Sequence, residues 1–363
     1  MIKILGLFPL RGNGGIASWA NKFTSTFPDV EFRLYVVDTA PGKDFIKLRG
    51  FYKHIYGIKA FIHIYYNARK VIHANPDIKI MHTTTSAAMG TLRDYMIVRL
   101  CKKKGIKCIM HCHFGYIKEL YGGKGKWSQM FRKNIELYDQ TWVLDRRSAD
   151  FLRTIPSIRN KIMLTPNSID VPHSVEMKAS DYKKIGFIGN IIPSKGIFEL
   201  IQAVKELSDD THLYIAGTGT DEDIDKMVSL IGNNIDRNIH FMGKLPNPEA
   251  VRLMESLDIV CLPTYFYAEA FPISILEAMS RGKLVISCPK AAIPDMLSMA
   301  DGSPCGILVA ERSASELAEA IKWCQSHPSE ALELRKKGYE KVKACYRKEV
   351  VYDIYRQNYR QLL

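Results

Sequence analysis

The sequence lacks several features that would place it in a broad class at once. No run of about eighteen uninterrupted apolar residues occurs, so no membrane-spanning helix is expected. The first residues, MIKILGLFPLRGNGG, lack the apolar core and cleavage site of a signal peptide, and they favour a first β-strand instead. The eight cysteines form no CxxC pair, which favours free thiols and a cytoplasmic protein.

Acidic residues are scarce in the first half of the chain. Residues 1–170 contain 28 lysines and arginines against 12 aspartates and glutamates, a net +16, whereas the remaining residues carry a net −3. Charge confined to one half indicates a partner on that half, and nucleic acid, an anionic membrane face and a phosphorylated substrate all fit. No RNA- or DNA-binding module is present, so we expect no nucleic acid.

Short apolar runs alternate with helical patterns along nearly the whole chain. This alternation predicts an α/β protein with two parallel sheets, because strands buried on both faces are almost continuously apolar. The length of 363 residues also favours two domains, 1–170 and 171–347, with a seam where Pro, Ser and Asn cluster. The predicted strands are 2–8, 32–37, 78–83, 106–113, 140–145, 161–167, 183–189, 211–217, 238–243, 258–263 and 283–288.

Open parallel sheets bind ligands at the carboxyl ends of their strands, so the loops that follow strands deserve the closest reading. Three loops contain glycines or charges, namely LRGNGGIAS, FIGNIIPSKG and PTYFYAEAFPISILEAMS. In the third, Glu269 precedes a predicted helix that contains Glu277, and Pro272 suits its first turn. The free N–H groups of a first helical turn attract an anion, and carboxylates beside them accept hydrogen bonds from hydroxyls. The E-x7-E spacing alone is common, and by itself it favours an ordinary solvated helix with two incidental glutamates.

The segments around this loop carry a family resemblance. These segments resemble those of glycosyltransferase family four and follow one another in the same order, namely Gly14-Gly15, TPNSID, GFIGNIIPSKGIFELIQAV, LYIAGTGTDED, EAFPISILEAM and CGILV. The resemblance covers nearly the whole chain. It implies a GT-B fold, in which two facing Rossmann-like domains with parallel sheets enclose an interdomain cleft. It also implies that a C-terminal helix, about 348–363, packs back on the first domain.

The same resemblance implies a retaining, metal-independent glycosyltransferase that uses a nucleotide sugar and no other cofactor. Lys195 would neutralise the diphosphate, Glu269 would face the donor sugar, and Glu277 would bind the ribose. Leu245 would cover the base. Gly14 and Gly15 would let the backbone approach the phosphates. Backbone N–H groups would come from the segment Phe271 to Ser274. Within this segment Phe271, Ile273 and Ser274 have an N–H group, whereas Pro272 does not.

Asn190 departs from this family, which has arginine at that position. An asparagine brings no charge and no bidentate fork, so the two-cation clamp on the diphosphate is incomplete. We expect Arg11, just before Gly14, to supply the second cation.

His113 is the histidine expected near the acceptor and the donor sugar, since it stands at the carboxyl end of the strand IKCIMHCH. Strand alternation places His111 and His113 on one face, with Cys108 and Cys112 on the other. The alternation therefore disfavours a zinc site, although a purely structural histidine remains an alternative.

The acceptor side of the chain is expected to contact lipid. Residues 44–70 interleave lysine and arginine with aromatic and aliphatic residues, as a cationic amphipathic helix does. We therefore expect a cytoplasmic enzyme, peripheral on the inner membrane face, that transfers a UDP- or GDP-linked hexose to a saccharide or lipid-linked saccharide in bacterial polysaccharide, lipopolysaccharide or capsule synthesis. Alternatives are a sugar-nucleotide epimerase of similar fold and a non-catalytic nucleotide-binding protein.

Overall fold

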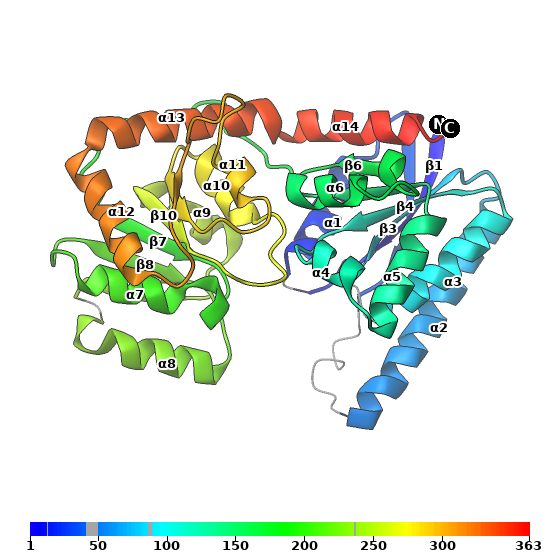
Figure 1. The fold of residues 1–363 in the computed structure, drawn as a ribbon, viewed down its shortest axis with the longest axis horizontal. Helices are drawn as coiled ribbons and strands as arrows, with labels where there is room; N and C mark the ends of the chain where they lie inside the picture. The colour runs from blue at the N-terminus through cyan, green and yellow to red at the C-terminus, as the bar shows by residue number, and fades with distance from the viewer. Residues whose placement is uncertain (13, 41–49, 86–88, 236) are drawn as a thin grey trace. The chain divides into compact units, whose positions relative to one another are not determined.

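The computed structural model describes residues 1–12, 14–40, 50–85, 89–235 and 237–363. These residues form two compact units (Figure 1). The first unit contains Met1–Pro166 together with Tyr352–Leu363, and the second contains Asn167–Val351. Residues 44–49 of the predicted cationic helix lie outside the described residues.

The first unit is a six-stranded parallel sheet in the order β2-β1-β3-β4-β5-β6, with helices around it (Figure 1). Its strands are β1 (Ile2–Phe8), β2 (Phe32–Asp38), β3 (Ile80–Thr85), β4 (Lys107–Cys112), β5 (Gln140–Val143) and β6 (Ile162–Leu164). Its helices are α1 (Gly15–Thr26), α2 (Gly50–Ala74), α3 (Met89–Lys103), α4 (Ile117–Gly122), α5 (Lys126–Leu137) and α6 (Arg146–Arg153), followed by the 3-10 turn Arg159–Lys161.

Strand β4 is buried on both of its faces, as its nearly continuous apolar sequence predicts. Cys108, Met110 and Cys112 point into one hydrophobic cluster with residues of α3 and α5. His111 points to the opposite face, where its ring lies 5.4 Å from that of Trp142. Both faces of the strand are therefore buried, which is the environment that near-continuous apolar runs require.

The last helix, α14 (Lys348–Arg360), passes from the second unit into the first. Tyr355 and Tyr359 are fully buried in the first unit, and their rings lie 4.9 and 5.2 Å from that of Trp142. The ring centre of Tyr352 lies 5.3 Å from that of Phe27. Residues from the end of the chain therefore cover one face of the first sheet.

The second unit is a six-stranded parallel sheet in the order β12-β11-β10-β7-β8-β9. Its strands are β7 (Lys184–Ile188), β8 (His212–Ala216), β9 (Ile239–Gly243), β10 (Ile259–Leu262), β11 (Leu284–Ser287) and β12 (Ile307–Leu308). Its helices are α7 (Ile197–Lys205), α8 (Asp221–Ile231), α9 (Asn247–Ser256), α10 (Ile273–Ser280), α11 (Ile293–Met296), α12 (Ala314–Ser326) and α13 (Pro328–Cys345), with 3-10 turns at Pro193–Lys195 and Gly232–Asn234.

In the second sheet, the chain first forms β7, β8 and β9 in sequence toward one edge. It then forms β10 beside β7 and continues with β11 and β12 toward the other edge, so the strand order reverses between β7 and β10. This is the strand order of a dinucleotide-binding Rossmann fold, and the reversal marks the crevice where such sheets bind ligands. All eleven predicted strands are present, and the α/β prediction is confirmed. The two-residue strand β12 was not predicted, because it is too short for a periodic pattern to reveal.

Candidate active site

The loops after β7 and β10 meet at the strand-order reversal of the second sheet. Tyr265 N donates to Ser194 O at 2.9 Å, and Thr264 Oγ1 donates to the same carbonyl at 3.4 Å. Gly196 has a φ of +77°, and a β-carbon there would lie 2.2 Å from Pro263 O. Only glycine fits this position, because both the backbone conformation and the close approach exclude a side chain.

The loop after β8 packs just as tightly on the loop after β7. A β-carbon on Gly217 would lie 1.8 Å from Gly189 O, and one on Gly219 would lie 2.3 Å from Ile191 O. The backbone pairs here as well, since Ile191 N donates to Thr218 O at 2.9 Å. The glycines of LYIAGTGTDED therefore hold two loops of this edge together.

Lys195 and Glu269 form an ion pair across the two switch-point loops, with side chains only 15% and 11% exposed. Thr264 Oγ1 donates to Glu269 Oε2 at 3.3 Å, and the Lys195 ammonium lies 5.3 Å from the centre of the Phe266 ring. Such a sheltered pair is held by several contacts, and its charges are weakly screened by solvent. The sequence predicted both residues but assigned them separate partners, whereas the structure pairs them.

Helix α10 begins directly after Glu269-Ala270-Phe271-Pro272, with Pro272 as its N-cap. No side chain caps this end, so the first N–H groups of the helix are left for another partner. Asn167 Nδ2 donates to Phe271 O at 3.1 Å, and Ala292 N donates to Ala270 O at 3.1 Å. The segment is thus fixed from its carbonyl side, while the helix start can attract an anion.

Three more predicted donor residues lie on the second unit. Glu277 is half-buried in the middle of α10. Asn190 is exposed in the loop after β7, and Leu245 is half-buried just after β9. Because all six strands are parallel, the loops after β7, β9 and β10 open at one edge of the sheet. The structure therefore gathers the loop residues near one edge, beside the start of α10.

The remaining predicted residues belong to the first unit. Gly14 and Gly15 follow β1, and a β-carbon on either would meet nothing within 4 Å. Packing among the described residues therefore does not require glycine at these positions. Arg11 Nε lies 2.6 Å from Asp38 Oδ2, and Arg11 Nη2 donates to Ala40 O at 3.4 Å. The arginine proposed as a second cation is thus already paired within the first unit.

His113 follows β4 and lies in a buried group of histidines. Its ring is 4.1 Å from that of His111 and 4.5 Å from that of Trp19. His82 Nε2 and His111 Nδ1 are 3.2 Å apart, and His82 Nδ1 is 2.6 Å from Tyr359 Oη. Burial lowers the pKa of His113 to about 3, and it lowers the pKa of His82 and of His111 well below 6.5. All three rings are therefore neutral at pH 7.

The Nε2 atom of His113 is buried, and it has no hydrogen-bond partner among the described residues. A buried polar atom without a partner costs free energy, so this nitrogen is suited to hydrogen bond with a ligand. His111, in contrast, contacts both His82 and Thr165, whose Oγ1 is 3.4 Å from its Nε2.

Sequence reasoning missed two cations on the second unit. The Arg312 guanidinium lies 4.7 Å from the centre of the Tyr265 ring, and Tyr265 Oη donates to Glu199 Oε1 at 3.2 Å. Lys290 is half-buried in the loop after β11, two residues before Ala292, whose N–H holds the segment of Glu269. Neither residue lies in a motif, and only the folded sheet brings their loops to this edge.

Asp221-Glu222-Asp223 has the Asp-x-Asp spacing that some glycosyltransferases use for a metal, but it forms the first turn of α8. Asp223 there accepts a hydrogen bond from Thr220 Oγ1 at 2.8 Å. Within the described ranges, no three His, Cys, Asp or Glu side chains gather as metal ligands.

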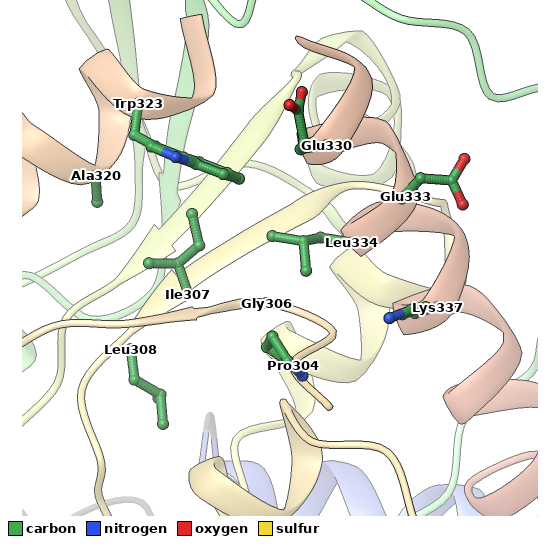
Figure 2. Close-up of a pocket in the computed structure, with 10 residues that line it drawn as sticks. All are labelled: Pro304, Gly306, Ile307, Leu308, Ala320, Trp323, Glu330, Glu333, Leu334 and Lys337. Atoms are coloured by element: carbon green, nitrogen blue, oxygen red, sulfur yellow. The ribbon is translucent and has the colours of Figure 1, made fainter. Parts of the chain in front are cut away.

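A pocket of about 560 Å³ lies elsewhere on the second unit, between β12, α12 and α13 (Figure 2). Ile307, Trp323 and Leu334 form an apolar wall, while Glu330 and Glu333 stand at one side (Figure 2). Two carboxylates repel a diphosphate, so this pocket is a poor donor site.

Comparison with known proteins finds a family match in the second unit. Residues 171–341 match the family described as glycosyl transferases group 1. An uncharacterised glycosyltransferase of Methanocaldococcus jannaschii is 25% identical over 74% of this chain and 70% of its own length. WcaL of Escherichia coli, a glycosyltransferase named for colanic acid biosynthesis, is 25% identical over 62% of this chain and 56% of its own length.

The fold is shared with solved structures over the whole chain. HepE of Anabaena, solved in complex with UDP, has a TM-score of 0.72 at 14% identity, and the match covers 99% of each chain. With two Rossmann-like parallel sheets, the described residues have the GT-B fold. The second unit, with its Lys195–Glu269 pair, therefore matches the glycosyl transferases group 1 family over residues 171–341, and the whole chain shares the GT-B fold.

Proposed function

We propose that this chain is a retaining hexosyltransferase that moves a sugar from a UDP- or GDP-linked donor to a hydroxyl of a saccharide or lipid-linked saccharide. The Lys195–Glu269 pair beside the uncapped start of α10 carries this proposal. HepE binds UDP in its solved complex, which supports a nucleotide donor. The name of WcaL, which refers to colanic acid biosynthesis, supports a role in polysaccharide synthesis, and we extend the proposal to bacterial lipopolysaccharide or capsule.

The diphosphate is the group that the second unit would stabilise. Lys195 and the N–H groups of the segment Phe271–Ser274 would balance the charge that develops as the nucleoside diphosphate leaves. Glu277 would accept hydrogen bonds from the ribose, and Leu245 would cover the base. Gly14 and Gly15, with open space around them, would admit phosphates close to the backbone.

Glu269 would have two tasks, to hold Lys195 in place and to face the donor sugar. A carboxylate beside the sugar also favours the positive charge of an oxocarbenium-like transition state. In a retaining reaction without a metal, the leaving phosphate oxygen takes the proton of the acceptor hydroxyl, so no side-chain base is needed. On the first unit, His113 is neutral and has an unpartnered Nε2, and we propose that it binds a hydroxyl of the acceptor.

We also propose that the enzyme is cytoplasmic and binds the anionic inner face of the membrane through α2. Ile58, Ile62 and Tyr66 are 53%, 58% and 65% exposed, and they recur every four residues along this helix. No aspartate or glutamate occurs in α2, whereas Lys59, Arg69 and Lys70 do. An exposed apolar stripe on an acid-free basic helix suits a membrane surface. None of the described helices is both long and apolar enough to span a membrane.

A ligand panel followed by product analysis tests the function. We expect UDP or GDP to raise the melting temperature of the purified chain, because a ligand of the folded state stabilises it. The matching sugar nucleotide should then be consumed only with a saccharide acceptor, and NMR should show the donor's anomeric configuration in the product. Consumption without any acceptor, giving an isomeric donor, would indicate an epimerase. Tight binding without turnover on a broad acceptor panel would indicate a non-catalytic nucleotide-binding protein.

A further inference from the structure

A second pocket, of about 760 Å³, lies in the first unit between α2 and the carboxyl end of β2. Its floor is apolar, with Val36, Val37 and Ile64. Tyr56 and Asn67 from α2 add an aromatic ring and an amide. Its size and mixed lining are those of a small-molecule site that fixes one polar ligand, rather than of a packing defect in the core.

The charged residues that line this pocket are mostly cationic. Arg11, Lys59 and Lys70 line it together with His63, and Asp38 is the single carboxylate among the residues that line it. Asp38 is already satisfied, because its Oδ1 accepts from Leu10 N at 3.0 Å and Ala40 N at 2.8 Å, while its Oδ2 pairs with Arg11. The pocket therefore presents more positive charge than its own carboxylate balances.

The two lysines differ from Arg11 in what they can bind. Lys59 and Lys70 are exposed, and both extend from the same helix, which has no acidic residue of its own. Ammonium groups on flexible stems serve as point charges for phosphate. Asn67 Nδ2 and His63 Nε2 are 2.9 Å apart and add hydrogen-bonding groups beside them. An aromatic ring with amides and cations suits a sugar ring that carries a phosphate.

We infer that this pocket binds a phosphorylated saccharide and that this ligand is the acceptor of the transfer reaction, an inference that rests on the proposed function. The exposed stripe Ile58, Ile62 and Tyr66 lies on the same helix as the pocket lysines, around the helix from Ile64. A phosphosaccharide can therefore reach the pocket either from solution or from a lipid to which it is linked. Arg11 then serves the acceptor, rather than the donor diphosphate.

Calorimetric titration of the full chain with α-glucose 1-phosphate tests the pocket, with UDP present in excess to occupy the donor site. We expect Lys59→Gln combined with Lys70→Gln to weaken binding about tenfold or more, since hydrogen bonds to charged groups are worth about 1.5–3 kcal/mol each. Lys103→Gln combined with Lys104→Gln removes the same charge from exposed positions at the end of α3 and should leave binding unchanged. Glucose without phosphate should bind much more weakly.

A vesicle arm distinguishes the two sources. If the acceptor is lipid-linked, phosphatidylcholine vesicles carrying polyprenyl-linked glucose 1-phosphate should bind the wild type but not the Lys59/Lys70 variant. If the lysine substitutions weaken binding of the free sugar phosphate but not of the vesicles, the acceptor is soluble. Equal binding by wild type and the Lys59/Lys70 variant in both arms, no binding in either, or complete exclusion of the sugar phosphate by UDP, each overturns the inference. None of these readouts needs turnover, so failure of the pocket is distinguishable from failure of the proposed reaction.

Discussion

Lys195 has an opposite charge beside it before any substrate binds. Glu269 comes from a loop 74 residues later in the chain, and together the two side chains are largely shielded from water. The bound diphosphate must therefore share the ammonium group with Glu269 or displace that carboxylate. A pair arranged in this way keeps the cation positioned, which lowers the reorganisation needed during the reaction.

Replacing Lys195 should therefore abolish most turnover. We expect Lys195→Ala to lower kcat by about 10²–10³, the loss typical of one electrostatic donor at a reacting group. Lys322→Ala, on the exposed side of α12, serves as the matched control and should keep wild-type activity. Steady-state assays with a saturating donor provide the measurement. Near-native activity of Lys195→Ala would contradict the assignment of the switch-point loops as the donor site.

The buried histidines make stability depend on pH. The pKa of His113 falls from 6.5 to about 3 on folding because of burial, so the unfolded chain binds more protons between these values. The stabilisation is present above pH 6.5 and is lost as the pH falls. Between pH 7 and pH 5, His113 alone should lower the free energy of unfolding by about 2 kcal/mol.

Urea unfolding followed by tryptophan fluorescence at pH 7 and pH 5 measures this effect. His113→Gln should show a smaller loss of stability between the two pH values than the wild type. His173→Gln, at an exposed position, should lose as much as the wild type. A His113→Gln variant with the full wild-type pH dependence would show that other groups cause it.

Substitution by alanine should affect stability at one glycine of the predicted site loops and activity at another. Gly217→Ala places a β-carbon 1.8 Å from Gly189 O and should destabilise the second unit by about 1–3 kcal/mol, the usual cost of overpacking. Gly15→Ala meets nothing within 4 Å, so its melting temperature should not fall. Its kcat/KM should fall nonetheless if phosphates approach this backbone. Thermal denaturation and kinetics on both variants separate packing from function, and full activity of Gly15→Ala would remove it from the site.

At the scale of elements, the sequence predicted the strands, whereas the contacts made by the site residues became visible only in the structure. Strands such as β4 and β10 are apolar over their whole length, so their pattern is local and readable. The Lys195–Glu269 pair, the Arg11–Asp38 pair and the acceptor pocket depend on contacts between distant segments. Sequence spacing contains no information about such contacts, and family resemblance supplied roles but not partners.

Helix α2 shows how one element can serve two partners. Ile64, Ala68 and Ile72 face the core, whereas Ile58, Ile62 and Tyr66 are exposed. The lysines that line the pocket, Lys59 and Lys70, are exposed on the same helix. The apolar residues alone predict a helix without distinguishing core-facing from exposed positions, and burial in the structure separates the two sets.

At the scale of the whole molecule, the positive charge lies with residues 1–170, which carry a net +16. We expect the chain to co-sediment with phosphatidylcholine vesicles that contain phosphatidylglycerol, and to be released by salt, because surface charges are screened within about 10 Å at 0.1 M salt. Ile62→Asp should lower this binding by placing a carboxylate in the exposed stripe. Val228→Asp, an exposed apolar position in α8, is the control. Equal binding to neutral and anionic vesicles would contradict a membrane role.

The passage of α14 between units has a consequence for how the chain is made. Tyr352–Leu363 belong to the first unit, but a ribosome reaches them only after the whole of Asn167–Val351 has been synthesised. Until then, the face of the first sheet that Tyr355 and Tyr359 cover stays unprotected. Domains usually fold as they emerge, the N-terminal one first. Here the last part of the first unit is synthesised after the second, so we expect this aromatic surface of the nascent chain to stay exposed until then.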